Sequence, residues 1–371
     1  MDHPLIDLPQ HMLPSDGRFG SGPSLVRQES VLDIALSGRT YLGTSHRSEP
    51  IKRVVADIRQ DLATLFALPD DYEVVLGVGG TTVFWDCAAF SLIEQRSEHL
   101  VLGEFSSKFA AVATGAPHLD DPVVIESEPG TAPTADPSAD VDAFALIHNE
   151  TSTGVMMPVT RPVGAPGLVL VDGTSAAGAM PVDPEDFDVY YFSPQKAFGS
   201  EGGLWIALSS PAALDRMGRL ATSRWIPPSL DLSTAAENSR KDQTYNTPGL
   251  ATLWLLRSQA AWMLAMGGLS WAADRSAASS AHVYEWAESS KYAIPFVADP
   301  SDRSTTVVTV DLDGVVDAST VSAVLRTNGI VDIDGYRKLN RNQLRIACFP
   351  NIETANVEAL TAAIDYVVER I

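Results

Sequence analysis

The feature that most constrains the fold is a series of short apolar runs, rich in Val, Ile, Leu and Tyr and mostly bounded by Gly, Pro or Asp. Runs of this kind, with helical stretches between some of them, are typical of strands buried on both faces of a mostly parallel sheet. They occupy residues 73–76, 99–103, 122–125, 143–148, 167–172, 189–193 and 204–208. The sequence therefore predicts an α/β fold.

The pattern divides the chain into a long region and a shorter one. Helical spacing of apolar residues predicts an amphipathic helix over 51–66, and the length and composition of 83–93 predict a buried helix. Beyond about residue 250 we expect helices over 251–267, 269–289, 318–328 and 353–371, with strands over 305–312, 330–333 and 343–348. We predict an N-terminal arm (1–15), a large α/β domain (16–260) and a small C-terminal α+β domain (261–371), with a surface loop over 126–140.

Composition excludes several classes of function. There are 26 basic and 47 acidic residues, so the net charge of −21 disfavours nucleic-acid backbones and anionic membranes as partners. The apolar runs are too short to span a bilayer, and the N-terminal residues show no signal-peptide pattern. Cys87 and Cys348 lie outside any Cys-x-x-Cys or Cys/His pattern, which predicts no disulfide, no metal site and a cytoplasmic location.

The first candidate site is the turn from Gly79 to Thr82, between a predicted strand and a predicted helix. Two glycines let the backbone approach a ligand closely, and a helix N-terminus offers free N–H groups and a partial positive charge. Two threonine hydroxyls add donors, so the turn could hold a phosphate. A plain tight turn with threonine as the helix N-cap stays an alternative.

Two further candidates end predicted strands. Asp172 follows the run 168–171, where open α/β sheets bind ligands, although it could simply cap a helix. Lys196 follows the run 189–193 among small and apolar residues. Desolvation there would lower the pKa of its ammonium and make the amine reactive toward an aldehyde; a solvated loop lysine is the alternative. An anion site, a carboxylate for a ring nitrogen and a lysine for an aldehyde together match pyridoxal phosphate.

With these residues in place, the sequence resembles the fold-type I pyridoxal-phosphate enzymes, and within them the phosphoserine aminotransferases in their actinobacterial form. The resemblance runs from about residue 16 to the end and implies a large domain with a seven-stranded, mostly parallel sheet. It is carried by segments 19–23, 43–47, 79–82, 148–151, 193–196, 245–248 and 341–345.

The resemblance also implies roles for individual residues. Lys196 would bind the cofactor aldehyde, and Asp172 would pair with its ring nitrogen. Other expected cofactor contacts are Phe105 on the ring face, Thr151 near the ring, Thr81, Thr82 and Gln195 at the phosphate, and Asn246 and Thr247 reaching that phosphate from the neighbouring subunit of a homodimer. Expected substrate contacts are Arg345 on the α-carboxylate, Arg47 and His46 on the distal anion, and Ser21. Without the resemblance, a structural role is the better explanation for His46, Phe105 and Trp85, and Arg47 could form a surface ion pair.

The implied reaction converts 3-phosphooxypyruvate and L-glutamate into O-phospho-L-serine and 2-oxoglutarate in serine biosynthesis, and the resemblance also implies action on a related phosphorylated keto acid of pyridoxine biosynthesis. Where the enterobacterial form has an arginine, this chain has Thr82, which leaves one cation unaccounted for. Replacements could come from Arg18, Lys241, Arg337 or Arg341. A fold-type I lyase or desulfurase and a non-catalytic phospho-ligand binding protein remain the alternative functions.

Overall fold

Strand residues point alternately to the two faces of a sheet, and in this chain both faces are covered. In the computed structural model, which describes residues 6–137, 140–164 and 166–371, Val169 and Val171 join one buried apolar cluster. Their neighbours Leu168 and Leu170 join a second cluster on the opposite face. Burial on both sides explains why the strands read as continuous apolar runs rather than alternating ones.

The larger sheet has seven strands in the order β1-β9-β8-β7-β4-β2-β3. The strands from β8 to β3 run parallel, whereas β9 is antiparallel to both of its neighbours, β1 and β8. The predicted mostly parallel α/β sheet is therefore confirmed. Its strands are β1 (Glu73–Val78), β2 (Ser97–Val101), β3 (Val123–Glu126), β4 (Ala143–Ile147), β7 (Leu168–Asp172), β8 (Val189–Phe192) and β9 (Leu204–Ser209).

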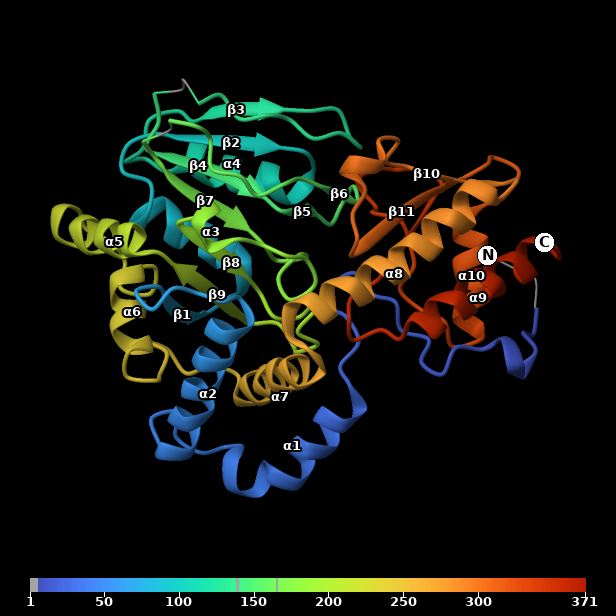
Figure 1. Cartoon of the computed structure of the whole chain (residues 1–371), viewed down its shortest axis with the longest axis horizontal. Helices are drawn as coiled ribbons and strands as arrows, with labels where there is room; N and C mark the ends of the chain where they lie inside the picture. The colour runs from blue at the N-terminus through green and yellow to red at the C-terminus, as the bar shows by residue number, and fades with distance from the viewer. Residues whose placement is uncertain (1–5, 138–139, 165) are drawn as a thin grey trace.

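Helices cover this sheet on both sides (Figure 1). The amphipathic helix predicted over 51–66 is α2, and it packs against α7 and β1. The buried helix predicted over 83–93 begins earlier, as α3. Helices α1, α4, α5 and α6 were not predicted. The bounds are α1 (Gln28–Tyr41), α2 (Glu49–Leu65), α3 (Gly80–Ser91), α4 (Glu104–Gly115), α5 (Pro211–Ser223), α6 (Leu232–Ser239) and α7 (Leu250–Met266).

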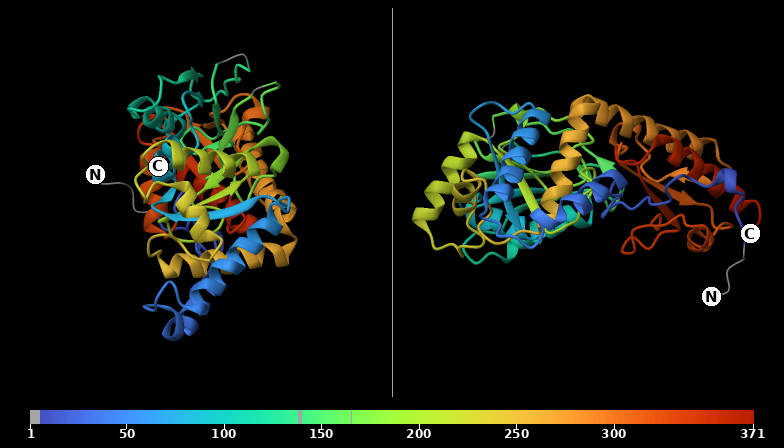
Figure 2. Two further views of the ribbon diagram at one scale, coloured as in Figure 1. Left: turned by 90° about the vertical axis from the view of Figure 1, so that its left-hand side faces the viewer. Right: turned by 90° about the horizontal axis from the view of Figure 1, so that it is seen from below.

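A smaller lobe lies beside the large one, and the long helix α8 runs from one to the other (Figure 2). Its sheet has the order β10-β11-β12 and is antiparallel throughout. Buried apolar residues of α8, α9 and α10 fill the space against the sheet. The bounds are α8 (Gly268–Ser289), β10 (Ala293–Pro295), β11 (Val307–Leu312), α9 (Ala318–Thr327), β12 (Gln343–Ala347) and α10 (Thr354–Val368).

The strand predicted over 330–333 is wrong. That stretch forms only a single bridge, between Val331 and Arg18 of the N-terminal arm. The N-terminal arm provides both backbone hydrogen-bond partners of Val331: the Val331 N–H donates to the Gly17 carbonyl, and the Phe19 N–H donates to the Val331 carbonyl. Asp332 then turns the chain, because its φ is +65°. The third strand of the small sheet is instead β10, which the sequence did not predict.

The remaining elements are short. A hairpin of β5 (Asn149–Glu150) and β6 (Val155–Met156) follows β4, and the described part of the chain contains three short 3-10 helices. These are η1 (Gln10–Met12), η2 (Pro184–Asp186) and η3 (Pro300–Asp302).

The predicted arm and loop each extend beyond the described residues. Of the predicted arm, residues 1–5 lie outside them, and the described part packs on the small lobe through a Leu8–Asn328 hydrogen bond of 2.8 Å. Of the predicted loop, 138–139 lie outside, and 127–137 contain neither helix nor strand. The domain boundaries stay a prediction. No helix in the described part of the chain is long and apolar enough to cross a membrane.

Candidate active site

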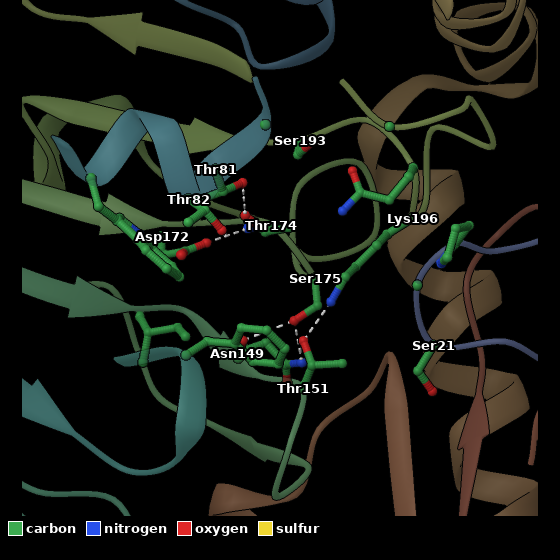
Figure 3. Close-up of a pocket in the computed structure, with 18 of the residues that line it drawn as sticks. Ser21, Thr81, Thr82, Asn149, Thr151, Asp172, Thr174, Ser175, Ser193 and Lys196 are labelled. Carbon is green, nitrogen blue, oxygen red and sulfur yellow. Dashed lines mark hydrogen bonds between the residues drawn. The ribbon is translucent and has the colours of Figure 1, made fainter. Parts of the chain in front are cut away.

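A pocket of about 440 Å³ lies where β4, β7 and β8 end and α3 begins, with the small lobe contributing one wall (Figure 3). Its position follows from topology, because parallel strands present their carboxyl ends at one edge of a sheet, beside the helix N-termini that follow. Nine of the residues predicted from the sequence line it: Ser21, Thr81, Thr82, Phe105, Thr151, Asp172, Gln195, Lys196 and Arg345.

The turn before α3 has the form expected of an anion cradle. Gly79 and Gly80 take φ values of +114° and +73°, which glycine adopts without strain. Gly79 is the N-cap and supplies no side chain to bond the first N–H groups of α3, so the alternative of a threonine N-cap is wrong. Thr81 lies in the first turn and shares a 2.9 Å hydrogen bond with Thr174 across the pocket. Gly79, Gly80, Thr81 and Thr82 all line the pocket, so the N-terminus of α3, with its free N–H groups and the positive end of its dipole, lies in the pocket wall.

Asp172 is the last residue of β7 and is buried. Burial raises the pKa of its carboxyl to about 6, although the Thr174 N–H donates to its Oδ1 at 2.8 Å and opposes the rise. The turn after it contains no helix, so Asp172 does not serve as a helix cap. A buried carboxylate that is hydrogen-bonded to the neutral Thr174 is suited to a cationic partner in the pocket.

Lys196 is also buried, which excludes the alternative of a solvated loop lysine. Its Nζ donates a 2.5 Å hydrogen bond to Thr151 Oγ1 across the pocket (Figure 3). Burial, followed by the nearby Arg345 guanidinium, lowers the pKa of its amine to about 7. Gly22 is required beside it, because a Cβ there would lie 2.8 Å from Lys196 Cε.

Three of the predicted site residues that line the pocket carry buried atoms with no hydrogen-bond partner among the described residues: Ser21 Oγ, Gln195 Oε1 and Arg345 Nε. Arg345 Nη1 donates to the Thr151 carbonyl at 3.2 Å, and burial lowers the pKa of its guanidinium. Buried polar groups in folded proteins nearly always have partners. These atoms therefore indicate a polar ligand.

Aromatic side chains form the remaining walls. Phe105, the second residue of α4, is half-buried, and its ring centroid lies 5.5 Å from Lys196 Nζ. It is thus close enough to face a ring held at the lysine. Trp85 both lines the pocket and belongs to the buried core, as composition alone suggested.

Sequence reasoning missed four polar residues that line the pocket: Asn149, Thr174, Ser175 and Ser193. Each follows β4, β7 or β8 by one to three residues, which is the same signal that identified Asp172. Asn149 Nδ2 donates to Ser175 Oγ at 2.8 Å, and Asn149 Oδ1 is buried without a partner.

Four predicted site residues do not line the pocket: His46, Arg47, Asn246 and Thr247. They come from two exposed segments that lie together, since His46 Nδ1 and Thr247 Oγ1 share a 3.2 Å hydrogen bond. Arg47, Asn246 and Thr247 are exposed. The chain by itself therefore forms one part of the predicted site and displays the other part on its surface.

The four residues that could replace the arginine absent at position 82 differ in their contacts. Arg18 is paired with Asp16 at 2.6 Å, and Arg341 is paired with Asp311. Lys241 is exposed and lines none of the cavities around the pocket. Arg337 is exposed and forms no ion pair with a described residue, and it lines a cavity that adjoins the pocket and shares Arg345 with it.

Known proteins resemble the chain over nearly its whole length. The family model described as aminotransferase class-V matches residues 26–337. The chain belongs to the class-V aminotransferases. Among the relatives of this aminotransferase, the phosphoserine aminotransferase of Rhodococcus jostii (strain RHA1) is 54% identical over 368 residues, 98% of each chain. That of Nocardioides sp. (strain ATCC BAA-499 / JS614) is 54% identical over 370 residues, 99% of each chain.

Solved structures agree with the fold of this class-V aminotransferase. A phosphoserine aminotransferase from Cytophaga hutchinsonii superposes with a TM-score of 0.87 at 25% identity, covering 96% of this chain and 99% of that one. One from Bacillus circulans subsp. alkalophilus, at 19% identity, shares the fold with a TM-score of 0.83 over 95% and 98% of the two chains.

The two cysteines of this aminotransferase are both buried, Cys87 in α3 and Cys348 just after β12. Burial raises the pKa of the Cys87 thiol to about 12 and raises that of Cys348 as well. A desulfurase needs an accessible thiolate as nucleophile. Neither cysteine suits that alternative.

Proposed function

We propose that the chain is a phosphoserine aminotransferase, which moves the amino group of L-glutamate to 3-phosphooxypyruvate and yields O-phospho-L-serine and 2-oxoglutarate. The observation that carries the proposal is the convergence of Lys196, Asp172 and the N-terminus of α3 on one pocket. The names of relatives at 54% identity support the choice of substrate. The reaction belongs to L-serine biosynthesis. We also propose that the enzyme accepts a related phosphorylated keto acid of pyridoxine synthesis, and that it is located in the cytoplasm.

The pocket residues fit pyridoxal phosphate. Thr81, Thr82 and the first N–H groups of α3 would hold its phosphate, together with Gln195, whose Oε1 is buried without a partner. Asp172 would hold the protonated ring nitrogen, and Phe105 would lie on the ring face. When bound, the cofactor supplies an aldehyde that accepts the amino group and a ring that delocalises negative charge.

Lys196 performs two tasks in this proposal. Its amine would hold the cofactor aldehyde when no substrate is bound, and when free it would move the proton at the substrate Cα. The pKa of about 7 suits both tasks, because a substantial fraction of the amine is neutral at physiological pH. Thr151 orients the amine through the 2.5 Å hydrogen bond.

Both amino-acid substrates carry an α-carboxylate and a distal anion. Arg345 would bind the α-carboxylate, since a guanidinium matches a carboxylate with two parallel hydrogen bonds and its Nε lacks a partner. Ser21 Oγ would add a hydrogen bond to the substrate. Arg337 would act as the cation near the distal anion, because Arg18 and Arg341 are already paired with carboxylates.

The remaining four residues support a homodimer with shared sites. His46, Arg47, Asn246 and Thr247 lie together on the surface, away from the pocket of their own chain. In the proposed dimer they enter the partner subunit's pocket, where Asn246 and Thr247 reach the cofactor phosphate and His46 and Arg47 bind the distal anion of the substrate.

The function is tested with purified holoenzyme, L-glutamate and a panel of keto acids. We expect 3-phosphooxypyruvate to be the best acceptor. A protein that stays colourless with added pyridoxal phosphate would support a binding protein instead, and release of a product without transfer of the amino group would support a lyase.

The substrate roles of the two arginines are tested by comparing three amino donors. We expect Arg47→Ala to lower kcat/KM at least about tenfold for glutamate and phosphoserine, because a charge-assisted hydrogen bond contributes about 1.5–3 kcal/mol. Alanine, which has no distal anion, should lose much less, whereas Arg345→Ala should slow all three donors. Equal losses for alanine and phosphoserine in Arg47→Ala would contradict its role.

The shared site is tested by mixing two inactive variants. Lys196→Ala removes the amine from one subunit, and Asn246→Asp places a negative charge beside the phosphate of the partner's site. A mixed dimer keeps one site with both native residues, so activity should return after subunit exchange. No recovery after confirmed exchange would show that each site is built within one chain.

A further inference from the structure

Glu150 is a buried charged residue beside the pocket, next to the pocket-lining Thr151, and the proposed function gives it no task. It lies in β5, immediately before Thr151, and its exposed fraction is 0%. No lysine or arginine in the described ranges forms an ion pair with it. A buried carboxylate without a cationic partner is costly, so its retention beside the pocket requires an explanation.

The Glu150 carboxylate accepts five hydrogen bonds, which form two groups. Oε2 accepts from the backbone N–H of Phe105 at 3.1 Å, and from the N–H and hydroxyl of Ser106 at 3.0 Å each. Oε1 accepts from the N–H of Ser152 at 3.1 Å and from its hydroxyl at 2.7 Å. Its charge is therefore stabilised by dipolar donors, including the first-turn N–H groups of α4, which otherwise lack helical partners.

The first group of hydrogen bonds positions an aromatic wall. Phe105 is the second residue of α4, and its backbone N–H donates to the Glu150 carboxylate. This bond fixes the position of the Phe105 backbone, from which the aromatic side chain extends. The approach is close: a Cβ on Gly103 would lie 2.6 Å from Glu150 Cγ and 2.5 Å from Ser152 Oγ. Glycine at 103 is thus needed for the carboxylate to reach the helix.

The second group of hydrogen bonds positions the turn that contacts the reactive amine. Thr151 stands between Glu150 and Ser152, which are joined to each other through the carboxylate. Thr151 Oγ1 accepts from Lys196 Nζ, and its carbonyl accepts from Arg345 Nη1. Holding both neighbours of Thr151 therefore limits the movement of the atoms on which Lys196 and Arg345 rely.

We propose that Glu150 is a positioning residue, whose buried carboxylate joins the N-terminus of α4 to the Thr151 turn and so fixes Phe105 and Thr151 around Lys196. The inference rests on the proposed function insofar as it takes this pocket to be the cofactor site. Its negative charge also acts on the amine directly, since it opposes the fall in the Lys196 pKa caused by burial.

Two measurements on Glu150→Gln test the proposal, and neither requires turnover. The amide is isosteric, but its NH₂ cannot accept from the N–H groups that face it, so one of the two groups of bonds is lost. We expect the Kd for pyridoxal phosphate to rise at least tenfold, equivalent to about 1.4 kcal/mol. In cofactor-free protein, we expect the midpoint pH for acylation of Lys196, read by peptide mass, to fall.

Asp142→Asn is the control for a lost carboxylate that binds backbone N–H groups. Asp142 accepts from the backbone N–H groups of Glu94, Gln95 and Arg96 at 2.6–2.8 Å, at the opposite end of β4 from the pocket. It also forms an ion pair with Arg216 at 2.9 Å, so the control loses at least as much as Glu150→Gln does. Its replacement should lower stability in a similar way and leave both the cofactor Kd and the Lys196 midpoint unchanged.

The proposal is overturned if folded Glu150→Gln loses stability like the control but keeps the wild-type Kd and midpoint. Should Glu150→Gln not fold, Ser152→Ala keeps the charge and removes the 2.7 Å hydroxyl bond to Glu150, together with the 3.0 Å bond that the Glu104 N–H donates to the same hydroxyl. An unchanged Kd in that variant would equally overturn the proposal. A wild type that binds the cofactor but transfers no amino group would refute the proposed function without affecting either comparison.

Discussion

Replacing Thr151 by valine isolates the one hydrogen bond that orients the Lys196 amine. The change keeps the shape of the side chain and removes the hydroxyl, which accepts from Lys196 Nζ at 2.5 Å. A hydrogen bond involving a charged group contributes about 1.5–3 kcal/mol, against about 1 kcal/mol between neutral groups. The protonated amine therefore loses about 1 kcal/mol more than the neutral amine does.

A loss of that size corresponds to a little under one pKa unit, because one unit is about 1.4 kcal/mol. The pKa of Lys196, already lowered to about 7 by burial, should therefore fall toward about 6 in Thr151→Val. The assay is acylation of cofactor-free protein across a pH series, with the modified Lys196 peptide quantified by mass spectrometry. The carbonyl of residue 151, which accepts from Arg345, is unchanged by the substitution.

Thr153→Val is the control for this experiment. Thr153 is as buried as Thr151, but its hydroxyl donates to the Leu102 carbonyl at 3.2 Å and makes no contact with the lysine. Its replacement should leave the titration of Lys196 unmoved. A Lys196 pKa that is unchanged or raised in Thr151→Val, with the control behaving as stated, would refute the reasoning.

Three further outcomes follow from the same structure. Folding lowers the pKa of Lys196, so between about pH 7 and 10.5 the unfolded chain binds more protons than the folded chain, and this residue makes the free energy of unfolding rise with pH. Lys196→Met should remove that rise, as measured by denaturant titrations of cofactor-free protein. Gly22→Ala should weaken cofactor binding more than it weakens the fold, since its Cβ would lie 2.8 Å from Lys196 Cε, and equal spectra and affinities would contradict this. Gly77→Ala should destabilise the fold by about 3 kcal/mol or more, measured by urea unfolding, because its Cβ would lie 2.1 Å from the Trp205 ring on the paired strand β9.

The parts of the fold that were predictable are those governed by local patterns. Val169 and Val171 alternate with Leu168 and Leu170 between two buried faces, and this doubly buried arrangement makes the run continuously apolar. The stretch 330–333 is also rich in apolar residues, yet it is no strand, because Asp332 turns the chain at a φ of +65° and only Val331 pairs with the N-terminal arm. A local pattern contains no information about a partner more than 300 residues away in the chain.

The residues of the candidate site likewise differ in whether a local sequence pattern could identify them. Asp172 and Lys196 could be found because they directly follow apolar runs, and the edge of a parallel sheet brings strand ends together. Asn149, Thr174 and Ser193 obey the same rule and were missed, because a lone polar residue after a strand is common and has no distinctive chemistry.

The sequence by itself determined the α/β class with its mostly parallel sheet, the helix that follows the glycine turn, and the three chemical groups that match the cofactor. Only the tertiary structure decided that Ser21 and Arg345, from opposite ends of the chain, line the same pocket, and that Arg47 and Thr247 do not. It also decided the pKa of Lys196 and the five donors around Glu150. The physical reason is that desolvation and long-range hydrogen bonds arise from packing between distant segments, whereas strand and helix patterns arise from neighbouring residues.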